Sequence, residues 1–198
     1  SNQDPMKTNT RSLHIVKALE KKSLLKSILY FSLPLLFLFI LSCLDNNNPK
    51  LHVDFDAFYQ SSQALNQGLN PYESDNFNPP IFQMLFKPFS YLSSHASFLA
   101  WTSFMGVCFF FAIKLTADIF IEDKKLQRLY CLGLIVSFPF IKSLLIGQIT
   151  GLIFLLIIVG YHALTLKKYM FMGLFWGSAT ALKFFPGLIV FLLLKQKK

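Results

Sequence analysis

Residues 149–166 read ITGLIFLLIIVGYHALTL, a run of 18 residues without Asp, Glu, Lys or Arg. A helix of about 20 apolar residues crosses the hydrocarbon core of a bilayer, so this run predicts a membrane-spanning helix. Lys167 and Lys168 follow the run directly, and Gly147 and Gln148 precede it. Because basic residues collect on the cytoplasmic side of membrane proteins, we expect the run to begin outside and end at the cytoplasm.

Upstream, three more runs of 17 to 19 residues hold at most one charged residue each, and these are residues 28–44, 98–116 and 129–146. The first follows a long basic segment with no small-residue cleavage site, which favours an uncleaved signal anchor over a cleaved signal peptide. Residues 170–194 permit two arrangements. They form either one span of about 25 residues or two short helices that meet near Lys183 to Pro186 and return to the cytoplasmic side.

The overall composition agrees with a membrane protein. Hydrophobic residues make up 54% of the chain, charged residues 15%, and the mean hydropathy is +0.48; soluble domains average about 45–50% apolar and about 25% charged residues. The net charge of +9 comes mostly from basic residues beside the apolar runs, so it indicates membrane orientation and excludes a nucleic-acid stripe. The sequence therefore predicts an all-α, polytopic transmembrane bundle of about five to six membrane helices in contact with the lipid bilayer.

We divide the chain into a basic cytoplasmic N-terminus, residues 1–27, and a transmembrane domain, residues 28–198. Residues 1–5 precede Met6 and are left out of the fold prediction as an upstream extension. Within the domain, residues 45–96 carry five acidic residues against two lysines, so this loop is expected outside the cytoplasm.

The external loop contains a candidate amphipathic helix. Asp54 is predicted to cap it and Gly68 to end it. Its apolar face would carry Phe55, Phe58, Tyr59 and Leu65, and such a helix should lie along the membrane surface. The apolar hexapeptide at residues 81–86 is too short to span a bilayer, so we expect it to enter the interface or pack against the bundle.

Four motifs in this order resemble the amino-terminal half of the DUF2029 proteins, glycosyltransferase family 87. They are DFDAFYQSSQALNQGLNPY at 54–72, NPPIFQMLFKPFSYL at 78–92, IGQITGLIFLLIIVG at 146–160 and GLFWGSATALKFFPGLIVFLLLKQKK at 173–198. The family pattern is an Asp-Phe pair opening a helix that ends Gly-x-x-Pro-Tyr, a proline pair, a Gly-Gln before an apolar helix, and a helix ending Lys-x-x-Pro. Family members are longer than this chain, so we expect a fragment or a truncated reading frame.

The resemblance implies a GT-C fold and a hexosyltransferase that uses a polyprenyl-phosphate sugar, with mannose as the expected sugar. The acceptor would be a hydroxyl of a glycan or lipid on the non-cytoplasmic face, with inversion at the anomeric carbon and no cofactor beyond the lipid-linked donor. A multi-pass protein of the bacterial plasma membrane with a cytoplasmic N-terminus is the expected setting.

The resemblance also implies roles for individual residues. Asp54 would be the general base, although a simple N-cap explains the same residue. Lys183 would contact the donor phosphate, with snorkelling or pairing to helix-end carbonyls as the alternative. Gln148 would bind a sugar hydroxyl or tie the turn between two helices. Tyr72, which could equally shape the loop, and Asp56 complete the candidate substrate-binding set.

No metal site is expected at the Asp54-x-Asp56 pair, because helix positions two apart do not face each other and no third ligand is near. The two tryptophans, Trp101 and Trp176, fit interfacial anchors, and His52 reads as a surface residue. Two other functions stay open: a transporter-like bundle, for which a broken helix with an intramembrane lysine is equally natural, and a non-catalytic membrane remnant of the family.

Overall fold

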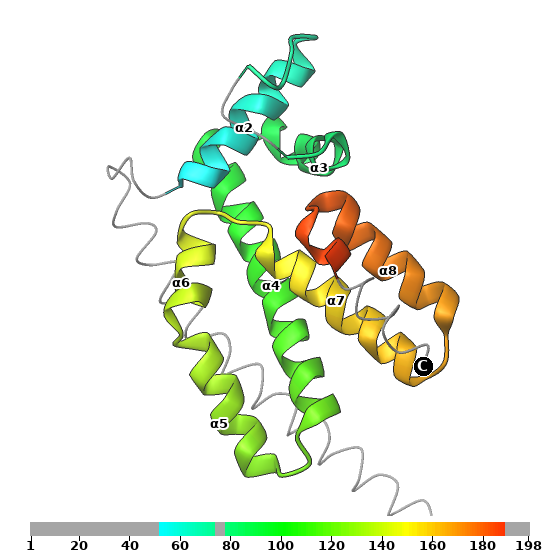
Figure 1. Ribbon diagram of the computed structural model, residues 1–198. Helices are drawn as coiled ribbons and strands as arrows, with labels where there is room; N and C mark the ends of the chain where they lie inside the picture. The colour runs from blue at the N-terminus through cyan, green and yellow to red at the C-terminus, as the bar shows by residue number, and fades with distance from the viewer. Residues whose placement is uncertain (1–51, 74–77, 189–198) are drawn as a thin grey trace, which may run out of the picture.

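The computed structural model describes residues 52–73 and 78–188. These residues form helices and connecting turns, without a β-strand, so the all-α class is confirmed for them. In order the elements are α2 (Val53–Asn66), α3 (Pro80–Phe86), the 3₁₀ helix η1 (Lys87–Tyr91), α4 (Ser94–Phe120), α5 (Lys124–Ile135), α6 (Phe138–Leu145), α7 (Thr150–Thr165), α8 (Tyr169–Leu182) and the 3₁₀ helix η2 (Phe185–Leu188) (Figure 1). The predicted segments 1–27 and 28–44 lie outside the described residues.

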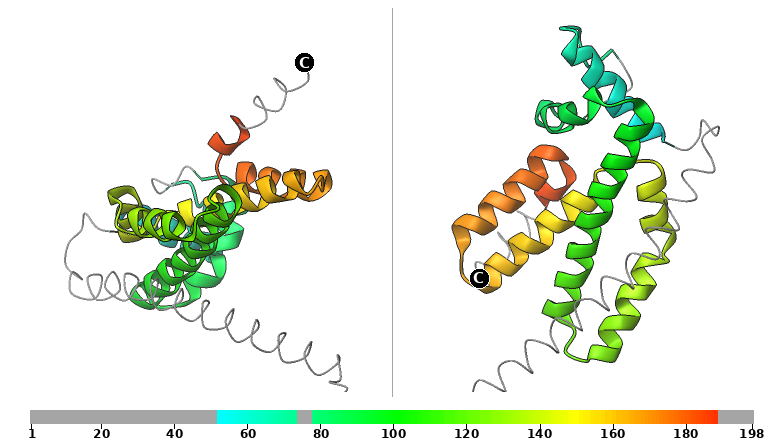
Figure 2. Two further views of the ribbon diagram at one scale, coloured as in Figure 1. Left: turned by 90° about the horizontal axis from the view of Figure 1, so that it is seen from below. Right: turned by 180° about the vertical axis from the view of Figure 1, so that it is seen from behind.

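The long helix α4 forms the axis of the structure. The α5–α6 arm lies on one side of it and the α7–α8 pair on the other, an arrangement visible from the front and from behind (Figures 1 and 2). Helix α7 packs against both α4 and α8. Helices α2, α3 and η1 gather at the end of the bundle where α4 begins, so the external loop of the sequence prediction forms a folded cap.

Among the described residues, α4 is the helix long and apolar enough to cross a membrane, at 27 residues. Helices α5 and α6 pass the same test only as a pair, with a bend of 47° between them, and the apolar α7 has 16 residues. The expected five to six membrane helices are therefore not confirmed. The predicted start and end of α7 agree with the structure to within one residue.

The continuous helix predicted over 129–146 is wrong. It breaks at Val136 and Ser137, between α5 and α6. Pro139 lies in the first turn of α6, where its missing N–H is tolerated. In an unbroken helix its ring would clash with the carbonyl of the residue four positions earlier.

A continuous helix over 170–194 is also excluded. Helix α8 ends at Leu182, Lys183 is extended, and the chain turns into η2 at Phe185. Pro186 accounts for the stop, since a helix running through it would lose a hydrogen bond and meet a steric clash. The break predicted near Lys183 to Pro186 is therefore present, and the course of residues 189–198 is beyond the described part of the chain.

Helix α2 ends as the sequence predicts but begins differently. Gly68 has φ +73, and the N–H groups of Gly68 and Leu69 bond the carbonyls of Leu65 and Ala64 at 3.2 and 2.9 Å, the two bonds of a Schellman motif. The predicted N-cap, Asp54, is wrong. The cap position is His52 at φ +82, and Asp54 lies inside the first turn with helical backbone, so its side chain does not cap.

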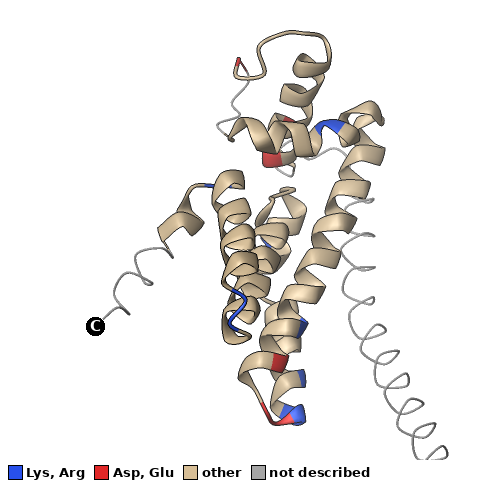
Figure 3. Ribbon diagram, turned by 90° about the vertical axis from the view of Figure 1, so that its right-hand side faces the viewer, with Lys and Arg blue, Asp and Glu red and all other residues tan. Residues whose placement is uncertain are grey.

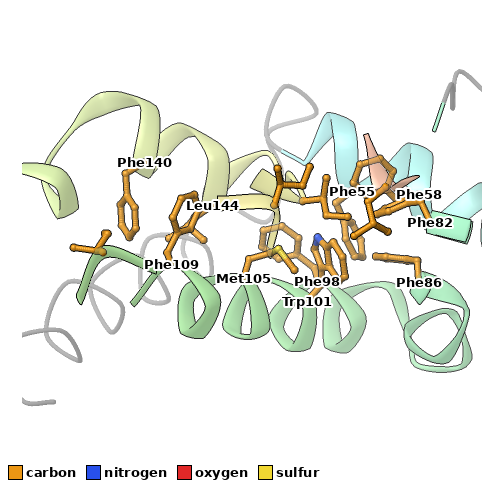
Figure 4. Packing of buried hydrophobic residues seen from close by; sticks show 14 of the residues in the cluster. Phe55, Phe58, Phe82, Phe86, Phe98, Trp101, Met105, Phe109, Phe140 and Leu144 are labelled. Atoms are coloured by element: carbon orange, nitrogen blue, oxygen red, sulfur yellow. The ribbon is translucent and has the colours of Figure 1, made fainter. Parts of the chain in front are cut away.

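The core between the cap and α4 is aromatic. Phe55 and Phe58 of α2 and Phe82 and Phe86 of α3 are buried around Trp101 of α4 (Figure 4). The ring centroids of Phe86 and Trp101 lie 4.9 Å apart in an edge-to-face pair, a favoured geometry. This confirms that the hexapeptide 81–86 packs against the bundle.

Both tryptophans pack within the bundle, and each donates an indole hydrogen bond to a backbone carbonyl of another element. Trp101 is fully buried, and its indole N–H donates to the Gly147 carbonyl at 2.7 Å. Trp176 is half-buried on α8 and donates to the Ile157 carbonyl of α7 at 3.0 Å. Sequence reasoning missed these roles because a tryptophan in an apolar run reads the same way whether it faces lipid or protein.

The two indole hydrogen bonds give a matched pair of variants. Trp101→Phe leaves the turn carbonyl of Gly147 buried without its donor, so we expect a loss of about 1–3 kcal/mol in the free energy of unfolding. Trp176→Phe should cost less, because Ile157 lies inside a helix where its carbonyl keeps a backbone donor. Thermal unfolding in detergent measures the stability of both variants. Equal losses would show that the Trp101 hydrogen bond contributes no more to stability than the Trp176 hydrogen bond.

Candidate functional site

The turn between α6 and α7 meets the first turn of α2. The backbone N–H of Phe55 donates to the Ile146 carbonyl at 3.1 Å, and Trp101 bonds the next carbonyl, that of Gly147. The turn of four residues, 146–149, therefore receives one hydrogen bond from α2 and another from α4. This junction joins segments that lie more than 80 positions apart in the sequence.

Gly147 is required at this junction for two reasons. Its φ of +74 lies in the left-handed region, which side chains with a Cβ rarely adopt. A Cβ on Gly147 would also lie 2.5 Å from the Cβ of Phe55. The glycine of the Gly-Gln motif thus allows the turn to approach α2 closely.

Asp54 and Gln148 are the sequence neighbours of the two residues in this contact. Asp54 directly precedes Phe55 and is partly exposed in the first turn of α2, where the helix dipole favours a negative charge. Gln148 directly follows Gly147. Its side-chain oxygen accepts the Thr150 hydroxyl at 3.0 Å and the Ser143 hydroxyl at 3.5 Å. The turn-tying role of Gln148 is therefore present, while the sugar contact stays a prediction.

Asp56 has a different environment. Its backbone N–H donates to the His52 carbonyl at 2.7 Å. Burial raises the pKa of the Asp56 carboxyl above its ordinary value, and the charge of His52 offsets part of that rise. No group of three or more His, Cys, Asp or Glu side chains is placed to hold a metal ion in the described residues.

His52 is a residue whose position sequence reasoning missed. It is partly buried, and its ring meets Phe98 of α4 edge to face with centroids 3.9 Å apart. Its positive φ is uncommon for a residue other than glycine, although histidine adopts it more often than most side chains do. The prediction of a surface residue was therefore wrong, because no sequence pattern indicates a histidine with left-handed backbone that packs on Phe98.

Lys183 and Tyr72 do not contact Asp54 or Gln148 through any hydrogen bond or ion pair between described residues. Lys183 is partly buried in the extended segment after α8, at the end of α8 that lies beside α3 (Figure 1). Tyr72 is exposed, and its backbone N–H donates to the side-chain oxygen of Asn70 at 3.0 Å, as in a turn. Of the five predicted site residues, Asp54 and Gln148 are therefore the two that directly adjoin, in sequence, the contact between α2 and the turn.

Charge is distributed unevenly along the bundle. Lys and Arg, Asp and Glu gather toward its two ends, with a mostly uncharged middle (Figure 3). One end carries α2 with Asp54 and Asp56, and the other carries the turn from α4 to α5 with Lys124, Lys125 and Arg128. An uncharged zone between two charged ends is the pattern of a protein embedded in a bilayer.

The family model of glycosyltransferase family 87 matches residues 76–198. This match covers more than half of the 198 residues, so the chain belongs to glycosyltransferase family 87, a family of membrane glycosyltransferases. Gln148 and Lys183 lie within the match, whereas Asp54, Asp56 and Tyr72 precede it. Neither the curated proteins nor the solved structures provide a match to the chain.

Two glycines with nearly the same backbone conformation test the junction. Gly68→Ala places a Cβ in open space at φ +73, so it should cost only the strain of a left-handed alanine, about 1–2 kcal/mol. Gly147→Ala adds the clash with Phe55, and we expect a further loss of about 1–3 kcal/mol. Thermal unfolding of the two variants checks this difference, and equal melting temperatures would show that the turn does not press on α2.

The environment of Asp56 predicts a pH dependence. Because its pKa is higher in the folded protein, the folded state binds more protons between the two pKa values, so this residue lowers stability as pH rises through that interval. Asp56→Asn should therefore raise the melting temperature at pH 7 and lose this advantage below the ordinary pKa of an aspartate. Melting curves of both proteins across pH measure the effect; an unchanged or lower melting temperature of Asp56→Asn at pH 7 would contradict it.

Proposed function

We propose that this glycosyltransferase transfers a hexose, with mannose as the expected sugar, from a polyprenyl-phosphate donor to a hydroxyl of a glycan or lipid acceptor. The reaction takes place on the non-cytoplasmic face of the membrane and inverts the anomeric carbon. Family membership supports sugar transfer in general. The observation that carries the finer proposal is the junction at which Phe55 bonds Ile146, because it brings a carboxylate beside the Gly-Gln turn at one end of the bundle.

The distribution of basic residues supports the outward orientation of Asp54. Lys124, Lys125 and Arg128 follow the end of α4, and Lys167 and Lys168 follow α7. Under the positive-inside rule these turns face the cytoplasm, so the opposite end, with α2, faces outward. A multi-pass arrangement in the bacterial plasma membrane, with a cytoplasmic N-terminus, belongs to this proposal.

The chemistry assigns Asp54 the role of general base. The acceptor oxygen forms a bond to the anomeric carbon while the bond from that carbon to the phosphate oxygen breaks. Asp54 takes the proton of the acceptor hydroxyl, and polyprenyl phosphate leaves with the electron pair. The ammonium of Lys183 would stabilise the charge on the phosphate as it departs.

Asp56, Gln148 and Tyr72 remain candidate substrate contacts. Gln148 keeps its amide N–H groups for a sugar hydroxyl while its oxygen accepts Thr150. The family match favours transfer over a transporter-like bundle. A non-catalytic remnant predicts that the purified chain transfers no sugar at all, so the wild-type assay separates that alternative.

Replacing the proposed base tests the reaction. Asp54→Asn keeps the size of the side chain but cannot accept the proton, so we expect sugar transfer from a labelled polyprenyl-phosphate mannose in membranes to fall at least about 100-fold. Glu73→Gln is the matched control, since it neutralises an exposed carboxylate of the same external region and should leave transfer unchanged. Transfer by Asp54→Asn at the wild-type rate would exclude Asp54 as the base.

The orientation has its own readout in the same membranes. Gln60 on α2 and Glu122 in the turn after α4 are exposed, so Gln60→Cys and Glu122→Cys offer labelling sites at opposite ends. A membrane-impermeant maleimide added from outside should label the first variant only. Labelling of Gln60→Cys from the cytoplasmic side alone would overturn the proposed site of reaction.

A further inference from the structure

Gln83 is a buried polar residue on α3. It lies between Phe82 and Phe86 in the sequence, and only 2% of its surface is exposed. Within the described part of the chain, neither its amide nitrogen nor its amide oxygen has a hydrogen-bond partner. A buried amide in this state costs about 1–3 kcal/mol for each unsatisfied group, so it calls for an explanation.

Helix α3, which carries this amide, contacts two elements of the proposed site. Helix α3 packs against α2, which carries Asp54, and against α8, which is followed by Lys183. The edge-to-face contact of Phe82 with Phe58, at 4.5 Å between centroids, fixes α3 against α2. Gln83 therefore belongs to the helix that bridges the element bearing the proposed base and the element bearing the proposed phosphate contact.

A lipid-linked sugar donor has its sugar between the acceptor and the phosphate. A group that lies on the bridging helix is suited to the sugar, and an amide can donate to one hydroxyl while it accepts from another. Exposed Ile81 and Met84 lie on the same short helix, so α3 offers apolar side chains to lipid on the face away from Phe82 and Phe86. Movement of α3 relative to α8 would give the sugar access to the amide.

We infer that Gln83 binds hydroxyl groups of the donor sugar and that α3 closes over the donor with this amide facing it. This inference rests on the proposed function, because it uses the positions of Asp54 and Lys183. It adds a sugar-binding residue on α3, an element that contains neither Asp54 nor Lys183.

The test replaces the amide with an apolar side chain of similar length. Gln83→Met removes a buried unsatisfied group, so it should raise the melting temperature in detergent while it weakens donor binding. A gain in stability together with a loss of binding is the result that a merely structural glutamine does not produce. Ser97→Ala is the matched control, because it removes a fully buried hydroxyl on α4 that also has no hydrogen-bond partner among the described residues, and it should leave donor binding unchanged.

Two probes separate the sugar contact from the phosphate contact. Binding of farnesyl-phosphate mannose and of farnesyl phosphate is measured for the full chain in detergent. Gln83→Met should weaken binding of the first about tenfold and leave the second unchanged. Lys183→Met should weaken both, because both carry the phosphate.

The outcomes that overturn the inference are distinct from those that overturn the proposed function. If Gln83→Met lowers stability, the amide is a structural group with a partner, and the inference fails; Gln83→Leu repeats the binding measurement should the methionine variant not fold. Unchanged affinity of either variant for farnesyl-phosphate mannose also overturns it. Because binding is measured without turnover, a chain that binds the donor through Gln83 but transfers nothing refutes the transferase assignment and leaves the sugar contact standing.

Discussion

The structure depends on one close approach, where the backbone N–H of Phe55 donates to the Ile146 carbonyl and Gly147 lies against the side chain of Phe55. A bilayer supplies no hydrophobic force between helices, so their association relies on close packing and hydrogen bonds. Here one backbone hydrogen bond holds a turn of the bundle to α2, and one indole hydrogen bond, from Trp101, holds the same turn to α4. The position of every side chain in the first turn of α2, Asp54 included, follows from that contact.

The aromatic cluster explains why the cap formed by α2, α3 and η1 folds at all. Helix α3 has only seven residues, and isolated helices of this length are unstable. The rings of Phe82 and Phe86 reach Trp101 and bury completely. Tyr59 donates from its hydroxyl to the Leu92 carbonyl at 2.8 Å, and this bond ties α2 to the segment after η1. Packing on α4, rather than helix propensity, therefore orders the cap.

The sequence predicted the features that depend on a few neighbouring residues. It did not predict the features that depend on contacts between distant segments. The run at 149–166 became α7, and Gly68 ended α2, because length, polarity and a left-handed glycine act on a few neighbouring residues. Asp54 failed as a cap because the cap position is His52, two residues earlier, and the Phe55 N–H bonds the carbonyl of a residue 91 positions away. In the sequence, Gln83 is one residue of an apolar hexapeptide. The folded structure shows that its amide is buried without a hydrogen-bond partner among the described residues. Membrane sidedness predicted Asp54 and Gln148 at the same end of the bundle, whereas the contact between α2 and the turn at Gly147 was not predicted.

The boundary of the family match divides the proposed site. The matched region begins at residue 76, so it includes the Gly-Gln turn, α3 and Lys183 but not α2. If α2 made no contact with the matched region, α2 and its carboxylate could shift without moving the turn. The contact at Gly147 removes this freedom, because the turn has no room for a Cβ and accepts its hydrogen bond from the residue next to Asp54. Besides its left-handed backbone, the turn therefore requires glycine because of α2, and the positions of α2 and of the Gly-Gln turn depend on each other.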